Sequence, residues 1–378
     1  MVRKSHRIFM FIGSLTLSAV ISASIIPNPL CADQAETKAQ MPSLAEKGLM
    51  LYEKYCVLCH GQNGEGYLAD EANALSNQDF LVSASDDYIL QGILQGRPGT
   101  PMSAWAREKG GPLSLEEAGA IVSFIRTWQK EPSIDLGHAA VTGNAENGAP
   151  LYERWCAACH GKQGSGGKAP ELNNPVFQRT ASDAFIRYAI LNGRRRSAMS
   201  SYKDTLNHQE TNDVVSFIRT LKTQDGPPPA LNLDNEEYSV VTLEKGVLNP
   251  GNPPADFSLI ENKYVLADHV YTAYKADQTF MIIDARPKSD YLRSHIKGAL
   301  SIPFYDIENA IGLLPKDIWI ITYCVCPHAL SGNAADKLRA AGYDKVAVLD
   351  EGFLFWLKKG YPSESSIISE INKWLYPF

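Results

Sequence analysis

Two segments of the chain share a helical pattern of apolar residues. Residues 121–129 read IVSFIRTWQ and residues 214–222 read VVSFIRTLK. Apolar side chains recur in each at intervals of three, four and seven residues, which places them on one face of an α-helix. These side chains are Ile121, Phe124, Ile125 and Trp128 in the first copy and Val214, Phe217, Ile218 and Leu221 in the second. A capping box beginning at Ser114 or Asn207 precedes each copy, so the pattern predicts two small all-α units, each closed by one of these helices.

The pattern changes in the last third of the chain. Residues 225–256 are rich in proline and are predicted to be a linker that wraps around neighbouring structure. Beyond them, short apolar runs alternate with helical segments. The runs are residues 280–283, 319–323 and 346–349, followed directly by Asp284, Cys324 and Asp350. This alternation predicts an α/β domain with a central parallel sheet over residues 257–364, and a tail over residues 365–378.

The N-terminus carries the pattern of an export signal. Three basic residues, Arg3, Lys4 and Arg7, precede an uncharged and largely apolar stretch over residues 8–26. A basic segment followed by an apolar one is typical of secretion signals, and we expect residues 1–32 to be removed after Ala32. The apolar stretch is also long enough for a retained membrane anchor. Both alternatives predict a periplasmic protein.

Composition and charge narrow the class of function. The 378 residues are 44% hydrophobic and 21% charged, which is ordinary for soluble globular domains. Loss of residues 1–32 would lower the 36 Lys and Arg to 33, against 42 Asp and Glu, and so change the net charge from −6 to −9. An acidic surface disfavours nucleic acid as a partner, and it disfavours a membrane unless the signal segment is retained. It favours a redox partner protein with a basic docking face.

Each helical unit contains the sequence Cys-x-x-Cys-His. The first copy is Cys56, Cys59 and His60, and the second is Cys156, Cys159 and His160. Two thiols at this spacing can form thioethers to the two vinyl groups of a haem, and the adjacent imidazole can bind its iron. A zinc knuckle or a redox-active cysteine pair is the alternative use of such spacing. Two copies in matching contexts predict two covalently attached haem c groups.

A methionine lies between each haem motif and the closing helix of its unit. Met102 is in GRPGTPMSAW and Met199 is in NGRRRSAMSSY. An iron bound by histidine on one side needs a second ligand for simple electron transfer, and a loop methionine is soft and neutral. His138 and His208 are the alternative ligands, and a methionine can also serve only to fill the core. The basic run 194–196 either faces solvent or pairs with haem propionates or an anionic substrate.

The two helical units resemble class I-type cytochrome c domains over residues 44–131 and 143–224. In that family the loop methionine carries the distal sulfur, so the resemblance implies Met102 and Met199 as iron ligands opposite His60 and His160. It also implies a function in one-electron transfer.

The α/β region resembles the rhodanese family. The matching pieces, in order, are Asp284-Ala-Arg286, YLRSHIKGALSIPF, the strand that ends at Tyr323-Cys324, SGNAADKLRAAGY and LDEGFLFWLKKGYP. The resemblance implies that Cys324 heads a loop of backbone amides and carries a persulfide. Such amides and a helix N-terminus stabilise a thiolate or a bound anion. Asp284 and Arg286 are expected to form a structural ion pair at the end of the sheet.

The loop after Cys324 departs from the family pattern. It has seven residues and ends in Leu330, where the family has six residues and an arginine that holds the anionic donor. Seven is the length in the phosphatase branch of the fold, but phosphate chemistry without the arginine lacks its main charge clamp. Cys326 can form a strained disulfide with Cys324 or resolve its persulfide. His328 is either a substitute cation or acid, or a loop cap, and the two cysteines with His328 are also a candidate Cu(I) site.

Together these features predict an exported dihaem c-type cytochrome in which sulfur chemistry at a rhodanese-like domain is coupled to electron transfer. The candidate catalytic residues are Cys324, Cys326 and His328. The chain would act as a sulfurtransferase, or as an oxidoreductase that passes electrons from a small sulfur compound to a partner cytochrome or oxidase. Formation of one S–S bond from two thiols releases two electrons, and each haem iron accepts one. The alternative is an electron shuttle whose rhodanese-like domain is an inactive binding module.

Overall fold

The computed structural model describes residues 42–66, 72–137, 139–221, 246–325 and 328–365. All of these residues belong to one compact unit. The predicted export signal over residues 1–32, the rival ligand His138 and the candidate resolving residue Cys326 all lie outside the described residues. No helix in the described ranges is both long enough and apolar enough to cross a membrane.

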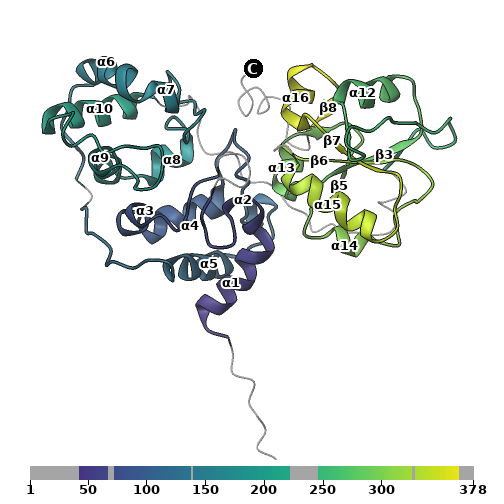
Figure 1. Ribbon diagram of the computed structural model, residues 1–378, viewed down its shortest axis with the longest axis horizontal. Coiled ribbons are helices and arrows are strands. Elements are labelled where there is room, and N and C mark those ends of the chain that lie inside the picture. The colour runs from purple at the N-terminus through teal and green to yellow at the C-terminus, as the bar shows by residue number, and fades with distance from the viewer. Residues whose placement is uncertain (1–41, 67–71, 138, 222–245, 326–327, 366–378) are drawn as a thin grey trace, which may run out of the picture. The chain divides into compact units, whose positions relative to one another are not determined.

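The first helical region begins with the segment that leads into the haem motif. Its elements are α1 (Leu44–Tyr55), α2 (Val57–His60), α3 (Gln78–Ser83), α4 (Asp86–Gln95), the 3-10 helix η1 (Arg107–Lys109) and α5 (Leu115–Arg126), as labelled in Figure 1. The predicted capping box at Ser114 and Glu117 is present. Trp128 lies beyond the end of α5, although the apolar spacing had placed it on the helix. Its ring still packs against those of Tyr52 and Phe124, at centroid distances of 5.3 and 4.9 Å.

The second helical region repeats this order. Its elements are α6 (Ala145–Trp155), α7 (Ala157–His160), α8 (Pro175–Thr180), α9 (Asp183–Asn192) and α10 (His208–Thr220). The second predicted capping box, Asn207 with Glu210, is also present. Leu221 is the C-cap of α10, so here too the last apolar residue of the pattern lies just outside the helix.

One close helix crossing holds each helical region together. α1 crosses α5, and α6 crosses α10. A Cβ atom at Gly48 would overlap the carbonyl oxygen of Ala120, and a Cβ atom at Gly148 would overlap that of Asp213. Glycine is therefore required at the same point of both copies, because a larger residue would push the two helices apart.

The last region is a mainly parallel sheet. Its order is β1 (Val247–Leu248), β3 (Phe280–Asp284), β6 (Ile320–Tyr323), β7 (Val346–Leu349) and β2 (Tyr264–Val265), with β5 (Leu300–Ser301) also paired to β3. Only the β1–β3 pair is antiparallel among these. A separate small ladder joins β4 (His295–Ile296) and β8 (Ser363–Glu364). The predicted central strands are thus confirmed, while β1 shows that part of the predicted linker 225–256 belongs to the sheet.

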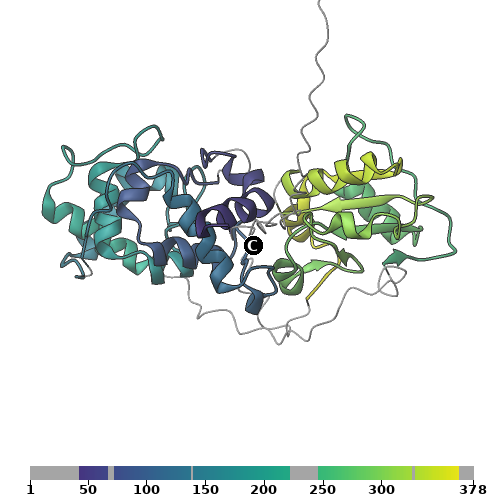
Figure 2. The ribbon, with the colours of Figure 1, turned by 90° about the horizontal axis from the view of Figure 1, so that it is seen from below.

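Helices cover both faces of this sheet, as Figures 1 and 2 show. The helices are α12 (Ala267–Lys275), α13 (Lys288–Arg293), α14 (Ile307–Ala310), α15 (Ala329–Ala340) and α16 (Gly352–Lys358). Alternate residues of the central strands enter different cores: Ile320 packs with α14 and α15, whereas Ile321 packs with α12 and α16. Because both faces are buried, the strands read as continuous apolar runs.

Candidate functional site

Both Cys-x-x-Cys-His motifs fold into the same compact turn. Helix α1 ends at Tyr55, Cys56 is its C-cap, and α2 continues to His60. The amide of Cys56 donates to the carbonyl of Tyr52 at 2.8 Å, and the Tyr52 hydroxyl donates to the carbonyl of Gly61 at 2.7 Å. The second copy repeats these bonds from Cys156 to Tyr152 and from Tyr152 to Gly161, at 2.8 Å each. The turn therefore has the same fixed shape in both regions.

The first thiol of each motif is partly buried, and its environment disfavours the thiolate that a redox-active cysteine pair needs. Burial raises the pKa of Cys56 to about 12 and that of Cys156 to about 11. A disulfide oxidoreductase needs a thiol with a lowered pKa instead. Among the described residues, no group of three or more His, Cys, Asp or Glu side chains is arranged to hold a metal ion.

The two motif histidines are held in the orientation that an iron ligand requires. Nδ1 of His60 lies 3.0 Å from the carbonyl oxygen of Asn73, and Nδ1 of His160 lies 2.8 Å from that of Pro170. A carbonyl oxygen only accepts, so Nδ1 carries the proton and Nε2 keeps its lone pair. Such a second bond fixes the tautomer of a metal-binding histidine. Burial also lowers the pKa of both rings, which favours the neutral form.

The two candidate methionines follow identical turns. The amide of Arg97 donates to the carbonyl of Met102 at 2.7 Å, and the amide of Met102 donates to the Thr100 hydroxyl at 3.1 Å. In the second region the corresponding bonds run from Arg194 to Met199 at 2.9 Å and from Met199 to a serine hydroxyl at 3.2 Å. The repeat thus presents a methionine at the same place in both units, directly after α4 or α9. Its role as an iron ligand stays a prediction.

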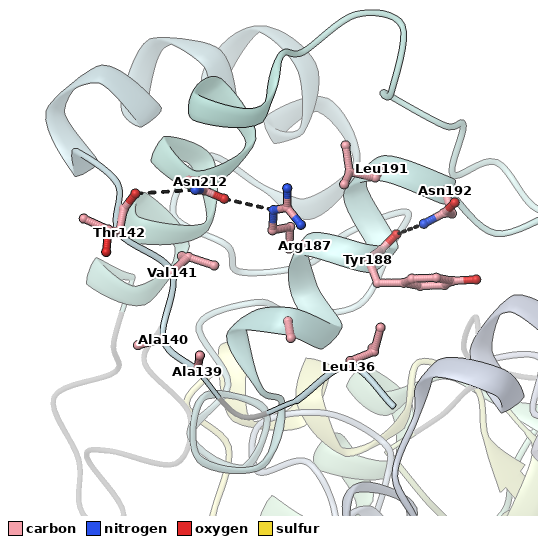
Figure 3. A pocket seen from close by; sticks show the side chains of 11 residues that line it. Leu136, Ala139, Ala140, Val141, Thr142, Arg187, Tyr188, Leu191, Asn192 and Asn212 are labelled. Carbon is pink, nitrogen blue, oxygen red and sulfur yellow. Dashed lines mark hydrogen bonds between the residues drawn. The ribbon is translucent and has the colours of Figure 1, made fainter. Parts of the chain in front are cut away.

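The rival ligand His208 is engaged elsewhere. It is the exposed first residue of α10, and its Nδ1 lies 2.7 Å from Nη2 of Arg187. Arg187 also lines a pocket with Asn212 and Tyr188, between α9 and residues 136 and 139–142 (Figure 3). No cysteine, histidine or methionine is among the residues that line this pocket. We therefore assign neither His208 nor the pocket to the haem chemistry.

The contact between the two helical regions is nearly symmetric, and sequence analysis did not predict it. The side chain of Asn77 donates to the carbonyl of Arg195 at 2.8 Å, and the side chain of Asn174 donates to that of Pro98 at 3.0 Å. These four residues occupy equivalent positions of the repeat. Arg195 also pairs with the buried carboxylate of Asp79 at 2.8 Å. The basic run 194–196 thus partly joins the two regions.

Arg97 provides an independent test of whether the first region fits a haem. Its guanidinium lies over the ring of Tyr88 at 5.3 Å, and its buried Nη1 has no hydrogen-bond partner among the described residues. A buried cationic donor is costly unless an acceptor completes it. A haem propionate is such an acceptor. The partly buried thiols, the histidines with a free Nε2 and this arginine all fit haem c.

Cys324 lies where parallel strands place functional residues, at the carboxyl end of β6. Its side chain is 1% exposed, and Sγ lies 3.2 Å from Oγ of Ser331 in the first turn of α15. The amide of Phe353 donates to the Cys324 carbonyl at 2.9 Å. Gly352 has a φ of 70°, and a Cβ atom there would lie 2.9 Å from that carbonyl oxygen. The sulfur therefore lies beside the first turn of α15, while the carbonyl of Cys324 lies against the start of α16.

His328 has a defined partner, Asp350. It precedes α15 with a φ of 80°, and its side chain makes no capping hydrogen bond. Its Nε2 lies 2.9 Å from a carboxylate oxygen of Asp350, and its ring packs on that of Tyr264 at 4.1 Å. Whether His328 serves as a substitute cation or acid or as a loop cap stays a prediction. Leu330, in the arginine position, is buried in the core.

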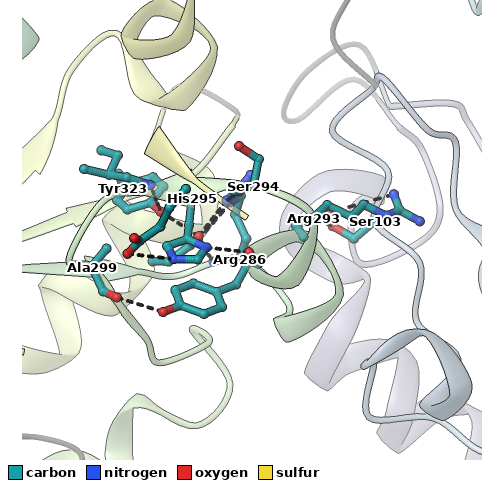
Figure 4. A network of polar contacts seen from close by, with 12 residues as sticks. Ser103, Arg286, Arg293, Ser294, His295, Ala299 and Tyr323 are labelled. Carbon is teal, nitrogen blue, oxygen red and sulfur yellow. Dashed lines mark hydrogen bonds and ion pairs between the residues drawn. The ribbon is translucent and has the colours of Figure 1, made fainter. Parts of the chain in front are cut away.

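Asp284 and Arg286 form the structural ion pair that the sequence predicted. Both are buried, and Nη2 of Arg286 donates to Oδ2 of Asp284 at 2.6 Å. The same nitrogen donates to the carbonyl of Ser294, and the Tyr323 hydroxyl donates to the Asp284 carboxylate at 2.7 Å (Figure 4). Burial raises the pKa of Tyr323 well above its usual value, so the hydroxyl keeps its proton. This network fixes the end of the sheet beside Cys324.

Two families match separate parts of the chain. The family described as cytochrome c oxidase, cbb3-type, subunit III matches residues 43–125 and again residues 143–218. The family described as rhodanese-like domain matches residues 267–359. The rhodanese-like domain of an Anabaena protein, solved by NMR, is 30% identical; the match covers 27% of this chain and 78% of that one, with a TM-score of 0.26.

Similar curated proteins are cytochrome c subunits. The cbb3-type cytochrome c oxidase subunit FixP of Bradyrhizobium sp. (strain ORS 278) is 27% identical over 195 residues, which are 49% of this chain and 64% of FixP. The cytochrome bc1 complex cytochrome c subunit of Corynebacterium diphtheriae is 24% identical over 231 residues, 56% of this chain and 79% of that protein. The chain thus spans less than two thirds of the FixP length. Cytochrome c domains carry covalently bound haem c. The chain therefore contains two cytochrome c domains, which are similar to those of cbb3-type cytochrome c oxidase subunit III, followed by a rhodanese-like domain.

Proposed function

We propose that this protein is an exported dihaem cytochrome c that couples sulfur chemistry at Cys324 to one-electron transfer. The observation that carries the proposal is the position of Cys324, with Sγ 3.2 Å from Ser331 Oγ at the start of α15. A helix N-terminus and a hydroxyl donor both stabilise a negatively charged sulfur. A cysteine so placed can hold a persulfide, and the same chain carries two haem motifs.

The residues that hold the two haem c groups would be the motif cysteines, histidines and loop methionines. They are Cys56, Cys59, His60 and Met102 in the first domain and Cys156, Cys159, His160 and Met199 in the second. Each bound haem supplies a one-electron acceptor. The Cys324 thiolate and one hydrosulfide ion form one S–S bond and release one proton and two electrons. Two ferric haems therefore balance one turnover.

His328 and Cys326 have supporting roles in this proposal. His328, oriented by Asp350 at 2.9 Å, accepts the proton that leaves the sulfur compound. Cys326 attacks the outer sulfur of the persulfide on Cys324, which frees the Cys324 thiolate and leaves the persulfide on Cys326; a small thiol acceptor then removes this sulfur as its own persulfide and frees Cys326. The buried side chain of Leu330 occupies the position of the arginine that binds the anionic donor in the family, so the loop provides no guanidinium for an anion. A small, singly charged sulfur compound suits it better than a dianion, which needs that charge.

The partners and the location follow from the chain's charge and its N-terminus. Export to the periplasm, with residues 1–32 either cleaved or kept as an anchor, fits the basic and apolar segments at the start of the chain. A mature net charge of −9 favours a cytochrome or oxidase partner with a basic docking face. The similarity to respiratory cytochrome subunits supports such a partner.

The second candidate function is an electron shuttle with an inactive rhodanese-like domain. Leu330 supports this candidate, because it stands where the family has an arginine, and without that arginine the loop lacks its usual anion-binding side chain. The two candidates differ in whether Cys324 takes up sulfur. In the first, the protein is a sulfurtransferase or a sulfur-compound:cytochrome c oxidoreductase.

Sulfur loading separates the two candidates. Full-length protein is treated with a low-molecular-weight persulfide and its peptides are weighed by mass spectrometry. We expect the Cys326→Ser variant to trap a loaded Cys324 with a gain of about 32 Da, one sulfur atom. Cys324→Ser, which keeps Cys326 as the internal control, should show no gain. Absence of loading in the wild type and in Cys326→Ser would favour the shuttle.

A further inference from the structure

The loop that follows Met102 is buried beneath the rhodanese-like domain. The Ser103 hydroxyl donates to a carboxylate oxygen of Asp290 at 2.5 Å, and the Ser289 hydroxyl donates to the carbonyl of Ala104 at 2.7 Å. Ser103 and Asp290 are 4% and 8% exposed, and Ser289 is fully buried. Ser289 and Asp290 belong to helix α13, and Figure 4 shows Ser103 beside Arg293, the last residue of that helix. Two buried hydrogen bonds therefore tie the residues next to the candidate iron ligand to α13.

Aromatic packing extends this contact to the haem motif itself. Tyr55, which directly precedes Cys56, packs on Trp105 at a centroid distance of 5.5 Å. Tyr305 of the rhodanese-like domain packs on both rings, at 5.1 and 6.1 Å. Helix α2, which holds the haem motif, also contacts α15, whose first turn faces Cys324. One interface thus joins the first haem site to the sulfur site.

The same face of the second cytochrome domain is open in the described residues. Ser200, Ser201 and Tyr202 occupy the positions of Ser103, Ala104 and Trp105 in the repeat. Both serines are exposed, and Tyr202 is only partly buried. Tyr202 packs on Trp155 of its own domain at 6.2 Å and donates to the Trp155 carbonyl at 2.9 Å. The aromatic pair is therefore present in both copies, but among the described residues only the first pair is covered by the rhodanese-like domain.

The two cytochrome domains touch through their own aromatic contact. Tyr88 and Phe185 are equivalent residues of the repeat, and their rings pack at 4.8 Å. Arg97 lies over Tyr88 and Arg194 lies over Phe185, each at 5.3 Å. A packed path of side chains thus links the first domain to the second.

We infer that the rhodanese-like domain is the internal redox partner of the first haem site, with Ser289 and Asp290 as positioning residues that hold the Met102 loop. Electrons then enter at the first site one at a time, pass to the second, and leave from its uncovered face. The order of electron entry rests on the proposed function. The role of Ser289 and Asp290 in holding the Met102 loop is independent of the proposed function, because it follows from the hydrogen bonds alone.

Ligand exchange tests the support of the loop without any sulfur compound. Oxidised full-length protein is titrated with imidazole, which displaces a methionine from iron and removes the weak long-wavelength sulfur-to-iron band. In a Met199→Ala background only the first site contributes to this band. In that background, Ser289→Ala and Asp290→Ala each remove one hydrogen bond that holds the Met102 loop. Each should therefore lower the imidazole concentration that half-displaces Met102 by about fivefold. Asp290→Asn keeps an oxygen acceptor for Ser103 and should restore the wild-type value.

Two matched controls make this result specific. Ser200→Ala, at the position equivalent to Ser103, should leave imidazole displacement unchanged in a Met102→Ala background. Ser289→Ala should also leave the second site unchanged in that background. Equal effects on both sites, or no effect of Asp290→Ala on the first, would overturn the inferred role of α13. The Asn variant separates a lost hydrogen bond from a general loss of folding.

The order of electron entry needs a second measurement. Sulfide-driven haem reduction is followed in Met102→Ala and in Met199→Ala, each of which lowers the potential of one haem. We expect Met199→Ala to keep a rapid phase that reduces one haem, and Met102→Ala to lose it. The reverse pattern would contradict entry at the first site. If the wild type is not reduced by sulfide at all, the proposed function fails, while the imidazole result still decides the role of α13.

Discussion

Asp350 places an acceptor 2.9 Å from Nε2 of His328, at the end of the strand next to the one that carries Cys324. The backbone carbonyl of Asp350 lies 3.0 Å from the same nitrogen. The imidazole is thus held by one residue through two oxygens, and by the ring of Tyr264 on one side. These contacts fix the orientation of the histidine, four residues after Cys324 in the sequence.

Removal of the Asp350 carboxylate should therefore slow sulfur loading of Cys324. We expect Asp350→Ala to lower the loading rate by about tenfold, because His328 loses one charge-assisted hydrogen bond and its orientation. Asp350→Asn keeps an oxygen acceptor for His328, so it should lower the loading rate by a smaller factor. The rate is measured by mass spectrometry at several times after addition of a persulfide. Equal rates in the wild type and both variants would leave His328 without a part in the chemistry.

Two complete haem motifs predict two covalently attached haems per chain. After acid-acetone extraction, the colour should stay with the protein and the ratio of haem to protein should be two. Cys156→Ala together with Cys159→Ala should lower this ratio to one, since the first motif is untouched. A ratio of one in the wild type, or haem in the extract, would contradict the assignment.

Met102 and Met199 should each account for about half of the sulfur-to-iron band. Each single alanine variant should lose that half and lower the potential of one haem, because a thioether ligand raises it. The double variant should have no band at all. Redox titration and the absorption spectrum of the oxidised protein provide the two measurements. A full band in the double variant would point to other iron ligands.

His295 should make the rhodanese-like domain less stable in acid. Burial holds the pKa of this ring below its ordinary value of 6.5, so the unfolded chain binds the proton more tightly than the folded one. The stabilisation is complete above pH 6.5 and is lost as the pH falls below it. The urea midpoint, measured by tryptophan fluorescence, should fall between about pH 7.5 and pH 5.5. His295→Gln should reduce this dependence, and an unchanged slope would assign the effect to other groups.

The sequence alone predicted the features that depend on residues close together along the chain. The haem motifs, the capping boxes at Ser114 and Asn207, and the strands around residues 280–283 and 346–349 follow from local spacing and apolar runs. The pair of Asp284 and Arg286 also came from a short motif. These features need few long-range contacts, so a single sequence is enough to predict them.

Long-range contacts could not be predicted in this way. Nothing in the pattern linked Ser103 to Asp290, which are 187 positions apart, or Asp79 to Arg195. Strand β1 was missed because only two residues pair with β3, inside a proline-rich segment. The glycine pair Gly48 and Gly148 was a detectable signal, since a glycine within a helix weakens it unless another backbone approaches.

The central claim is that sulfur chemistry at Cys324 sends electrons to the haems, and stopped-flow absorption tests it most directly. Oxidised wild type and Cys324→Ser are mixed with sulfide, and haem reduction is followed; dithionite then confirms that both proteins carry reducible haems. The account predicts that sulfide reduces both haems of the wild type, while Cys324→Ser stays oxidised until dithionite is added. Equal reduction of the two proteins by sulfide would contradict it and place the rhodanese-like domain outside the electron path.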